Sequence, residues 1–177
     1  MRVTGFLALG MLLAARPAVA DDEASNRPVV RSSEYGICFA RSIPDEDWGT
    51  CGETLVYFVD IDGDVLISRY GWFSSEIYLG GSGDRTIVRF GPWQRGSAPD
   101  SSHFALGIYR DGETIREYST LELAEAGSGF FRSVSHYEVF GARHGFRWLD
   151  SGTCVFEVEG VDGGVMSFDL ATGDILD

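Results

Sequence analysis

The sequence predicts an all-β fold, mainly antiparallel: a single β-sandwich or open barrel built from hairpins, with one short helix near residues 120–126. Three observations indicate this class. Asp-Gly pairs recur at 62–63, 111–112 and 162–163, each flanked by β-branched and aromatic residues, which is typical of hairpin turns. The 23 glycines are spread along a chain that is 13% aromatic, as antiparallel sheets with tight turns require. Only one segment carries clear helix signals.

The length predicts one domain, because 177 residues lie within the roughly 100–200 residues that a single domain uses. We expect a signal peptide over residues 1–20, a flexible N-terminal arm over 21–33, and a single β-rich domain over 34–177. The arm is polar, contains Pro28 and lacks periodicity, which is typical of loosely held termini.

The first 20 residues have the parts of a secretory leader. Arg2 gives a positive end, an apolar run extends from Phe6 to Ala15, and small residues at 18–20 precede Asp21. An N-terminal membrane anchor is the alternative, but this run of about ten residues is half of the roughly 20 that span a bilayer. We therefore expect a protein without a membrane span, exported to the periplasm or the extracellular space after cleavage near Ala20.

The first hairpin is expected between residues 55 and 70, and a further strand at 85–90, before Gly91-Pro92. Alternation along the first hairpin predicts that one face carries Leu55, Tyr57, Val59 and Ile61, with Val65 and Ile67 returning. In the middle hairpin, a two-residue turn at 111–112 sets Arg110 across from Glu113 and Ile108 across from Ile115.

The helix is predicted from its two ends. Ser119 and Glu122 have the spacing of a capping box, and Gly127 stands where a C-terminal glycine ends a helix. The segment is about two turns long, so it is an accessory to the sheets.

The last hairpin has a register that gives one apolar face. A three-residue loop at 162–164 places Val158 opposite Phe168 and Phe156 opposite Leu170, and it requires Gly164 in the left-handed conformation. Residues 168–176 resemble the strand-turn segment of quinoprotein-type propeller blades, and this resemblance implies a strand followed by a tight turn.

Three cysteines, Cys38, Cys51 and Cys154, cannot all pair within one chain. An exported protein can form disulfides, and Cys38 and Cys51 flank a polar loop of about 14 residues, whose closure is worth about 3 kcal/mol. We therefore predict a Cys38–Cys51 disulfide. Cys154 alternates with polar residues on a predicted strand, which favours an inward-facing, inert thiol over a reactive or intermolecular one.

Charge and composition exclude several classes of function. The net charge is −13, and all 14 basic residues are arginines. A surface this acidic disfavours nucleic acid and anionic lipid as partners. The absence of lysine excludes pyridoxal-phosphate enzymes with a Schiff-base lysine and P-loop NTPases, and no cofactor is predicted.

No catalytic or metal-binding motif is complete. Asp60, Asp62 and Asp64 alternate as calcium ligands can, but an EF-hand needs a glycine and a glutamate where Val65 and Gly71 stand. A hairpin turn with solvated acids is the simpler interpretation. The histidines, at 103, 136 and 144, lack zinc-pair spacing, and no Gly-x-Ser-x-Gly elbow occurs.

Tryptophan and arginine cluster at predicted strand ends, in segments 69–73, 89–95 and 146–149. These residue types are enriched at binding hot spots, and tryptophan also stacks on sugars and cations. The candidate binding residues are Trp72, Trp93, Arg95, Arg147 and Trp148. The alternative is that the tryptophans pack at the ends of the core, and Trp93 is expected to be the most exposed.

Two functions remain compatible with these observations. The first is an exported, soluble, non-enzymatic binding module, monomeric or weakly oligomeric, for a protein or an envelope or glycan ligand. An acidic inhibitor or immunity-type protein that blocks a basic protein is one form, because complementary charge accelerates encounter. The second is a small secreted hydrolase that uses His136, His144 and Glu138 or the Asp-rich turn.

Overall fold

Four antiparallel strands form an N-terminal sheet in sequence order. The computed structural model describes residues 25–81, 83 and 85–176, so the predicted signal peptide lies outside the described residues. The strands of this sheet are β1 (Val29–Ser32), β2 (Cys38–Pro44), β3 (Gly52–Phe58) and β4 (Val65–Tyr70). Part of the predicted N-terminal arm, at 29–32, therefore pairs with β2 as an edge strand.

The first hairpin, β3–β4, is present, but the residues predicted to share one face do not. Ile67 packs with Val56 and Tyr70 in a core cluster that does not include Leu55, and Ile61 is 98% exposed in the loop between the strands. The register shifts between Val56 and Tyr57. A bulge of this kind changes which residues share a face, so simple alternation through the Asp-Gly turn fails here.

A central sheet follows the N-terminal sheet along the chain. Its order is β5-β6-β8-β9, with β5 at Ile77–Gly80, β6 at Thr86–Phe90, β8 at Phe104–Arg110 and β9 at Glu113–Ser119. Strand β6 confirms the strand expected at 85–90. The turn at 111–112 pairs Arg110 with Glu113 as predicted, but Ile108 pairs with Arg116, because the register shifts between Ile108 and Tyr109.

The C-terminal sheet has the order β12-β13-β14-β15. Its strands are β12 (Phe140–Trp148), β13 (Cys154–Gly160), β14 (Val165–Asp169) and β15 (Ile175–Leu176). Phe156 pairs with Phe168 and Val158 with Met166. The predicted apolar face exists, but each partner differs by two residues, because the loop begins earlier and Gly163 adopts the left-handed conformation. The tight turn between β14 and β15 agrees with the strand-turn prediction.

The helix and a small sheet complete the fold. Helix α1 (Thr120–Leu123) has the predicted capping box between Ser119 and Glu122, and it continues as the π-helical turn η2 (Ala124–Ser128). The small sheet has the order β10-β11-β7, with β10 at Phe131–Arg132, β11 at His136–Glu138 and β7 at Gln94–Arg95. No helix in the described part of the chain has the length and apolarity needed to cross a membrane.

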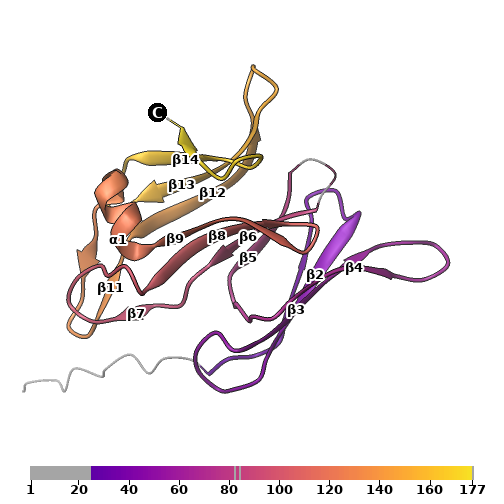
Figure 1. Cartoon of the computed structure of the whole chain (residues 1–177), viewed down its shortest axis with the longest axis horizontal. Coiled ribbons are helices and arrows are strands. Elements are labelled where there is room, and N and C mark those ends of the chain that lie inside the picture. The colour runs from indigo at the N-terminus through magenta and orange to yellow at the C-terminus, as the bar shows by residue number, and fades with distance from the viewer. Residues whose placement is uncertain (1–24, 82, 84, 177) are drawn as a thin grey trace, which may run out of the picture.

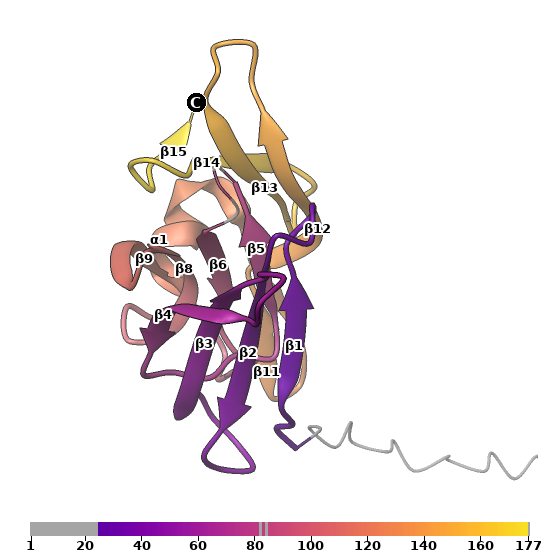
Figure 2. The ribbon, with the colours of Figure 1, turned by 90° about the vertical axis from the view of Figure 1, so that its right-hand side faces the viewer.

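The central sheet lies between the N-terminal and C-terminal sheets, so the all-β fold has three stacked layers (Figures 1 and 2). Neighbouring residues of β6 face opposite cores: Ile87 belongs to the core that contains Ala40 and Val56 of the N-terminal sheet, and Val88 to the core that contains Phe156 of the C-terminal sheet. The prediction of an all-β fold with one short helix is confirmed. The four sheets are open rather than closed into a barrel.

The predicted Cys38–Cys51 disulfide is absent. Cys38 is buried at the start of β2, where it pairs with Phe58, whereas Cys51 is exposed beside the opposite end of the hairpin. At about 3.3 Å per residue, the two cysteines are about 20 Å apart, and a disulfide requires Cα atoms within about 7 Å. The prediction failed because Cys38 begins a strand that runs toward the loop. Cys154 packs against the larger core, as predicted.

Candidate functional site

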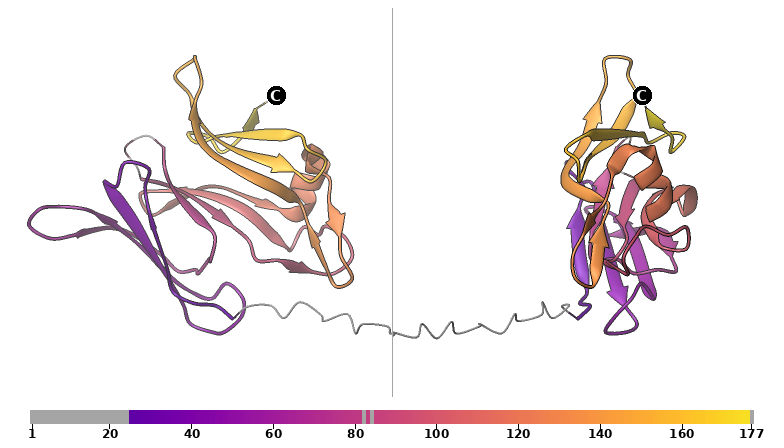
Figure 3. Two further views of the ribbon diagram at one scale, coloured as in Figure 1. Left: turned by 180° about the vertical axis from the view of Figure 1, so that it is seen from behind. Right: turned by 90° about the vertical axis from the view of Figure 1, so that its left-hand side faces the viewer.

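Trp93 is the most exposed aromatic residue among the candidate binding residues. The residue is 59% exposed, and it directly precedes β7 in the sequence. Strand β7 lies at the end of the molecule opposite the β3–β4 hairpin (Figures 1 and 3). Two grooves of about 440 and 250 Å³ meet at this ring. Trp48 lines the larger groove and Phe131 lines the smaller one. We call these three rings, Trp48, Trp93 and Phe131, the aromatic surface.

Polar side chains surround each groove. The larger groove also contains Pro92, Gln94, Arg95 and His103. The smaller groove also contains Ser133, His136, Tyr137 and Glu138. Each groove therefore combines apolar rings with hydrogen-bonding groups, which is the usual composition of a small-molecule site.

The position of Trp93 is fixed by the backbone on both sides of it. The Gly91 amide donates to the Ala105 carbonyl at 2.8 Å, and a side chain at Gly91 would collide with the Phe104 carbonyl at 2.2 Å. After Trp93, the Gln94 side chain donates to the Phe104 carbonyl at 2.9 Å. Strand β7 then pairs with β11, which carries His136. These contacts hold the ring against the smaller groove.

Trp48 reaches the same surface from the loop between β2 and β3. The Asn26 side-chain amide donates to the carbonyls of Glu46 and Gly49, at 3.2 and 3.0 Å. The Asn26 backbone amide donates to the Asp47 carbonyl at 2.7 Å. These three bonds fasten the loop on both sides of Trp48.

A buried hydrogen-bond network supports both grooves from behind. The Tyr137 hydroxyl is 2.6 Å from Nδ1 of His103 and 2.8 Å from Oγ1 of Thr120. Thr120 donates to the Asp100 carbonyl at 3.0 Å, so Tyr137 donates to Thr120 and accepts from His103. Burial raises the pKa of Tyr137, which keeps this hydroxyl protonated. The network joins the rim of the larger groove to the floor of the smaller one.

His136 has an unusual environment in the smaller groove. Its Nδ1 shares a hydrogen bond of 2.8 Å with the Ser135 hydroxyl. Its Nε2 is buried and has no hydrogen-bond partner among the described residues. The imidazole lies 6.1 Å from the Trp93 ring, centroid to centroid. Buried polar atoms are nearly always satisfied, so this nitrogen is an exception, and it is enclosed by the protein itself.

The other candidate binding residues lie elsewhere. Trp72 is half-buried, stacked on Tyr70 and over the Arg89 guanidinium, which agrees with the core-packing alternative. Arg147 forms an ion pair with Glu157. It lies beside Trp148 at the end of β12, whose hairpin is far from β7 (Figure 1). Of the five candidates, only Trp93 and Arg95 line one groove.

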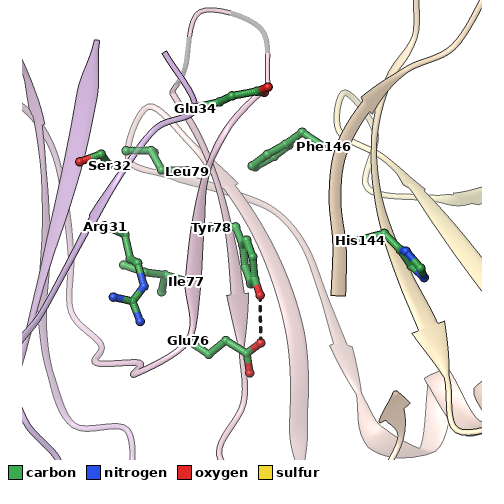
Figure 4. Close-up of a pocket in the computed structure, with 9 residues that line it drawn as sticks. All are labelled: Arg31, Ser32, Glu34, Glu76, Ile77, Tyr78, Leu79, His144 and Phe146. Carbon is green, nitrogen blue, oxygen red and sulfur yellow. Dashed lines mark hydrogen bonds between the residues drawn. The ribbon is translucent and has the colours of Figure 1, made fainter. Parts of the chain in front are cut away.

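A separate cleft of about 400 Å³ lies between edge strands β1, β5 and β12 (Figure 4). It contains Arg31, Glu34 and His144, and Glu76 at its edge accepts two hydrogen bonds from Arg143, at 2.8 and 3.1 Å. His144 and His136 therefore lie in different hollows. The hydrolase hypothesis placed His136, His144 and Glu138 in one site. Of these three residues, His136 and Glu138 share a groove and His144 does not.

The Asp-rich turn does not form a recognisable cation site. Asp60, Asp62 and Asp64 are exposed in the β3–β4 loop. Within residues 25–81, 83 and 85–176, no three potential ligands cluster in a way that could hold a metal ion.

Comparison with known protein families, with curated proteins and with solved structures gave no match to this chain.

Proposed function

We propose that the protein is an exported, non-enzymatic binding module whose ligand docks on the aromatic surface. The observation that carries this proposal is the exposure of Trp93 where two grooves meet. Tryptophan is highly buried on average, and it is enriched among the residues that dominate binding energy; Trp93 differs from the exposed Trp148 in lining two grooves.

A binding role is favoured over hydrolysis by the environment of His136. A general base needs a nucleophile on one ring nitrogen and an orienting acceptor on the other. Here Nδ1 contacts the neighbouring Ser135, and Nε2 has no described partner. Within the part of the chain that the structure describes, no acceptor therefore orients the His136 ring for proton transfer.

The proposal is tested with the chain from residue 21 onward, which keeps every described residue. Cosedimentation with insoluble envelope polysaccharide and retention on immobilised lysozyme, a cationic protein, are measured at low and moderate salt. We expect retention by the polysaccharide at both salt concentrations. Trp93→Ala should lose it, and Trp148→Ala, with a ring of similar exposure at 56%, should keep it.

Salt-sensitive retention on lysozyme that survives Trp93→Ala would instead support an acidic inhibitor that uses another surface.

Export is tested independently, by expressing the full chain in a bacterium and fractionating the cells. A periplasmic or secreted product whose mass begins at Asp21 would support it. An uncleaved cytoplasmic product would overturn it.

A further inference from the structure

The two grooves differ in charge from the rest of the protein. The chain has a net charge of −13, yet the ionised side chains that line the two grooves are Arg95 and Glu138, one of each sign. Electrostatic complementarity therefore favours a neutral ligand here. A cationic ligand would be attracted more strongly to surfaces of the protein that carry more carboxylates. An anionic ligand would be repelled by the net negative charge of the protein.

A purely apolar ligand is also a poor fit. It would cover the polar side chains that line the grooves, among them Ser133 and Arg95, without providing partners, and a buried polar atom without a partner is costly. It would also remove water from the Glu138 carboxylate and the Gln94 amide, which line the two grooves. The ligand must therefore offer hydroxyl or amide groups around an apolar face.

Sugar rings have this combination. A pyranose presents C–H groups on its face, which pack on the electron-rich face of an aromatic ring, and hydroxyls around its edge. Trp93 lines both grooves, Trp48 lines the larger and Phe131 the smaller. Three exposed rings over two adjoining grooves suit a chain of sugars better than a single one.

We propose that the aromatic surface binds a neutral oligosaccharide across at least two sugar rings, with the His136 imidazole beside the sugar at the Phe131 side. The inference rests on the proposed binding function and specifies its ligand. Trp93 stacks on the sugar that spans the junction, and Trp48 extends the site along the larger groove. Glu138 and Gln94 accept and donate hydrogen bonds at the two ends.

The test uses the chain from residue 21 and titration calorimetry with neutral glucose and N-acetylglucosamine oligomers of increasing length, from the monosaccharide to the hexasaccharide. Affinity should rise with length over the first few rings for at least one series and then level off. Trp93→Ala should weaken binding more than about tenfold, as loss of a hot-spot tryptophan does. Trp48→Ala should weaken only the longer oligomers.

His136→Ala should weaken binding by a smaller factor than Trp93→Ala, because its imidazole lines the smaller groove beside the Trp93 ring, without lowering the Tm. His144→Ala, in the separate cleft, is the matched control and should bind normally. Failure of every oligomer to bind, or binding that Trp93→Ala leaves intact, would overturn the oligosaccharide assignment. Trp93-dependent retention on envelope material without oligomer binding would overturn it while leaving the binding function standing.

Discussion

Arg89 is a buried cation that is held by aromatic rings. It is 6% exposed, and its guanidinium lies 4.5 Å from the centroid of Trp72 and 4.3 Å from that of Phe104. None of the ion pairs among the described residues includes it, and its Nε has no hydrogen-bond partner there. Its hydrogen bonds to the Tyr109 hydroxyl and the Phe73 carbonyl are long, at 3.4 and 3.5 Å. Stacking and packing therefore hold this side chain.

Packing should matter more than charge at this position. Arg89→Ala leaves a cavity between two rings and should lower the free energy of unfolding by about 2–4 kcal/mol. Arg89→Met fills the same slot without an unsatisfied nitrogen, and it should cost less than about 1.5 kcal/mol. Urea unfolding monitored by tryptophan fluorescence measures both. If Arg89→Met lowered the free energy of unfolding as much as Arg89→Ala, the positive charge rather than the packing would provide the stability.

The capping box gives helix α1 a predictable pH dependence. Hydrogen bonds from the Ser119 amide and hydroxyl to the Glu122 carboxylate lower the pKa of Glu122. Because the pKa is lower in the folded chain than in the unfolded one, this contribution is complete above the unfolded pKa and is lost as pH falls through the folded one.

Glu122→Gln should therefore flatten the decline in stability on the acid side. Ser119→Ala, which removes the cap, should cost about 1 kcal/mol at pH 7. Thermal unfolding between pH 7 and pH 3 checks both, with Glu125→Gln, in the next turn, as the control. A pH profile of Glu122→Gln that matches the wild-type profile would show that the capping carboxylate does not contribute.

At the scale of elements, the β2–β3 hairpin places Cys38 and Cys51 at opposite ends and gives the two thiols different reactivity. Cys51 is exposed, but a hydrogen bond and the negative charge of Glu46 raise its pKa. Cys38 is buried and Cys154 is half-buried. Native alkylation should therefore modify Cys51 first, and Cys38 only after unfolding.

Glu46→Gln should accelerate the alkylation of Cys51 at neutral pH, because more of the thiol is then ionised. Cys51→Ala should have the wild-type Tm with or without reductant. Peptide mass mapping reads out both results. A Cys38–Cys51 disulfide peptide under non-reducing conditions would contradict the strand register.

Element types could be predicted from local sequence more reliably than registers. The cap of α1 depends on residues three apart, and the Arg110–Glu113 turn on four consecutive residues, so both were confirmed. The bulges at Val56–Tyr57 and Ile108–Tyr109 depend on how each strand fits the neighbouring layer. No local pattern encodes that fit, so the predicted face of the first hairpin and the Ile108–Ile115 pairing were wrong.

At the scale of the whole molecule, the central sheet contributes to both cores. Ile87 and Val88 are adjacent and fully buried, each in a different core. Ile87→Ala and Val88→Ala should each lower the free energy of unfolding by about 2–4 kcal/mol without splitting the transition. Val65→Ala, on the exposed edge of β4, should change it by less than about 0.5 kcal/mol.

Circular dichroism and tryptophan fluorescence should give coincident unfolding curves for Ile87→Ala and for Val88→Ala, because the central sheet couples the two cores. Two separate transitions in either variant would mean that the outer sheets unfold independently.

The candidate site was only partly predictable for the same reason. Trp93 and Arg95 were identified because they are neighbours in an aromatic and arginine-rich segment. Trp48 and Phe131 come from segments about 40 residues away on either side, and the folding of the small sheet and the β2–β3 loop brings them together. An isolated tryptophan in the polar loop at 45–51 was the available signal for Trp48.

The three layers are also ordered along the chain: residues 29–70 form the first, 77–119 the second and 140–176 the third. In a polypeptide that emerges N-terminus first, the strands of the first sheet are synthesised before the strands that cover Ala40 and Val56. During that interval these apolar residues are open to chaperones and to other nascent chains. The order of biosynthesis thus leaves them without their cover until the middle third of the chain arrives.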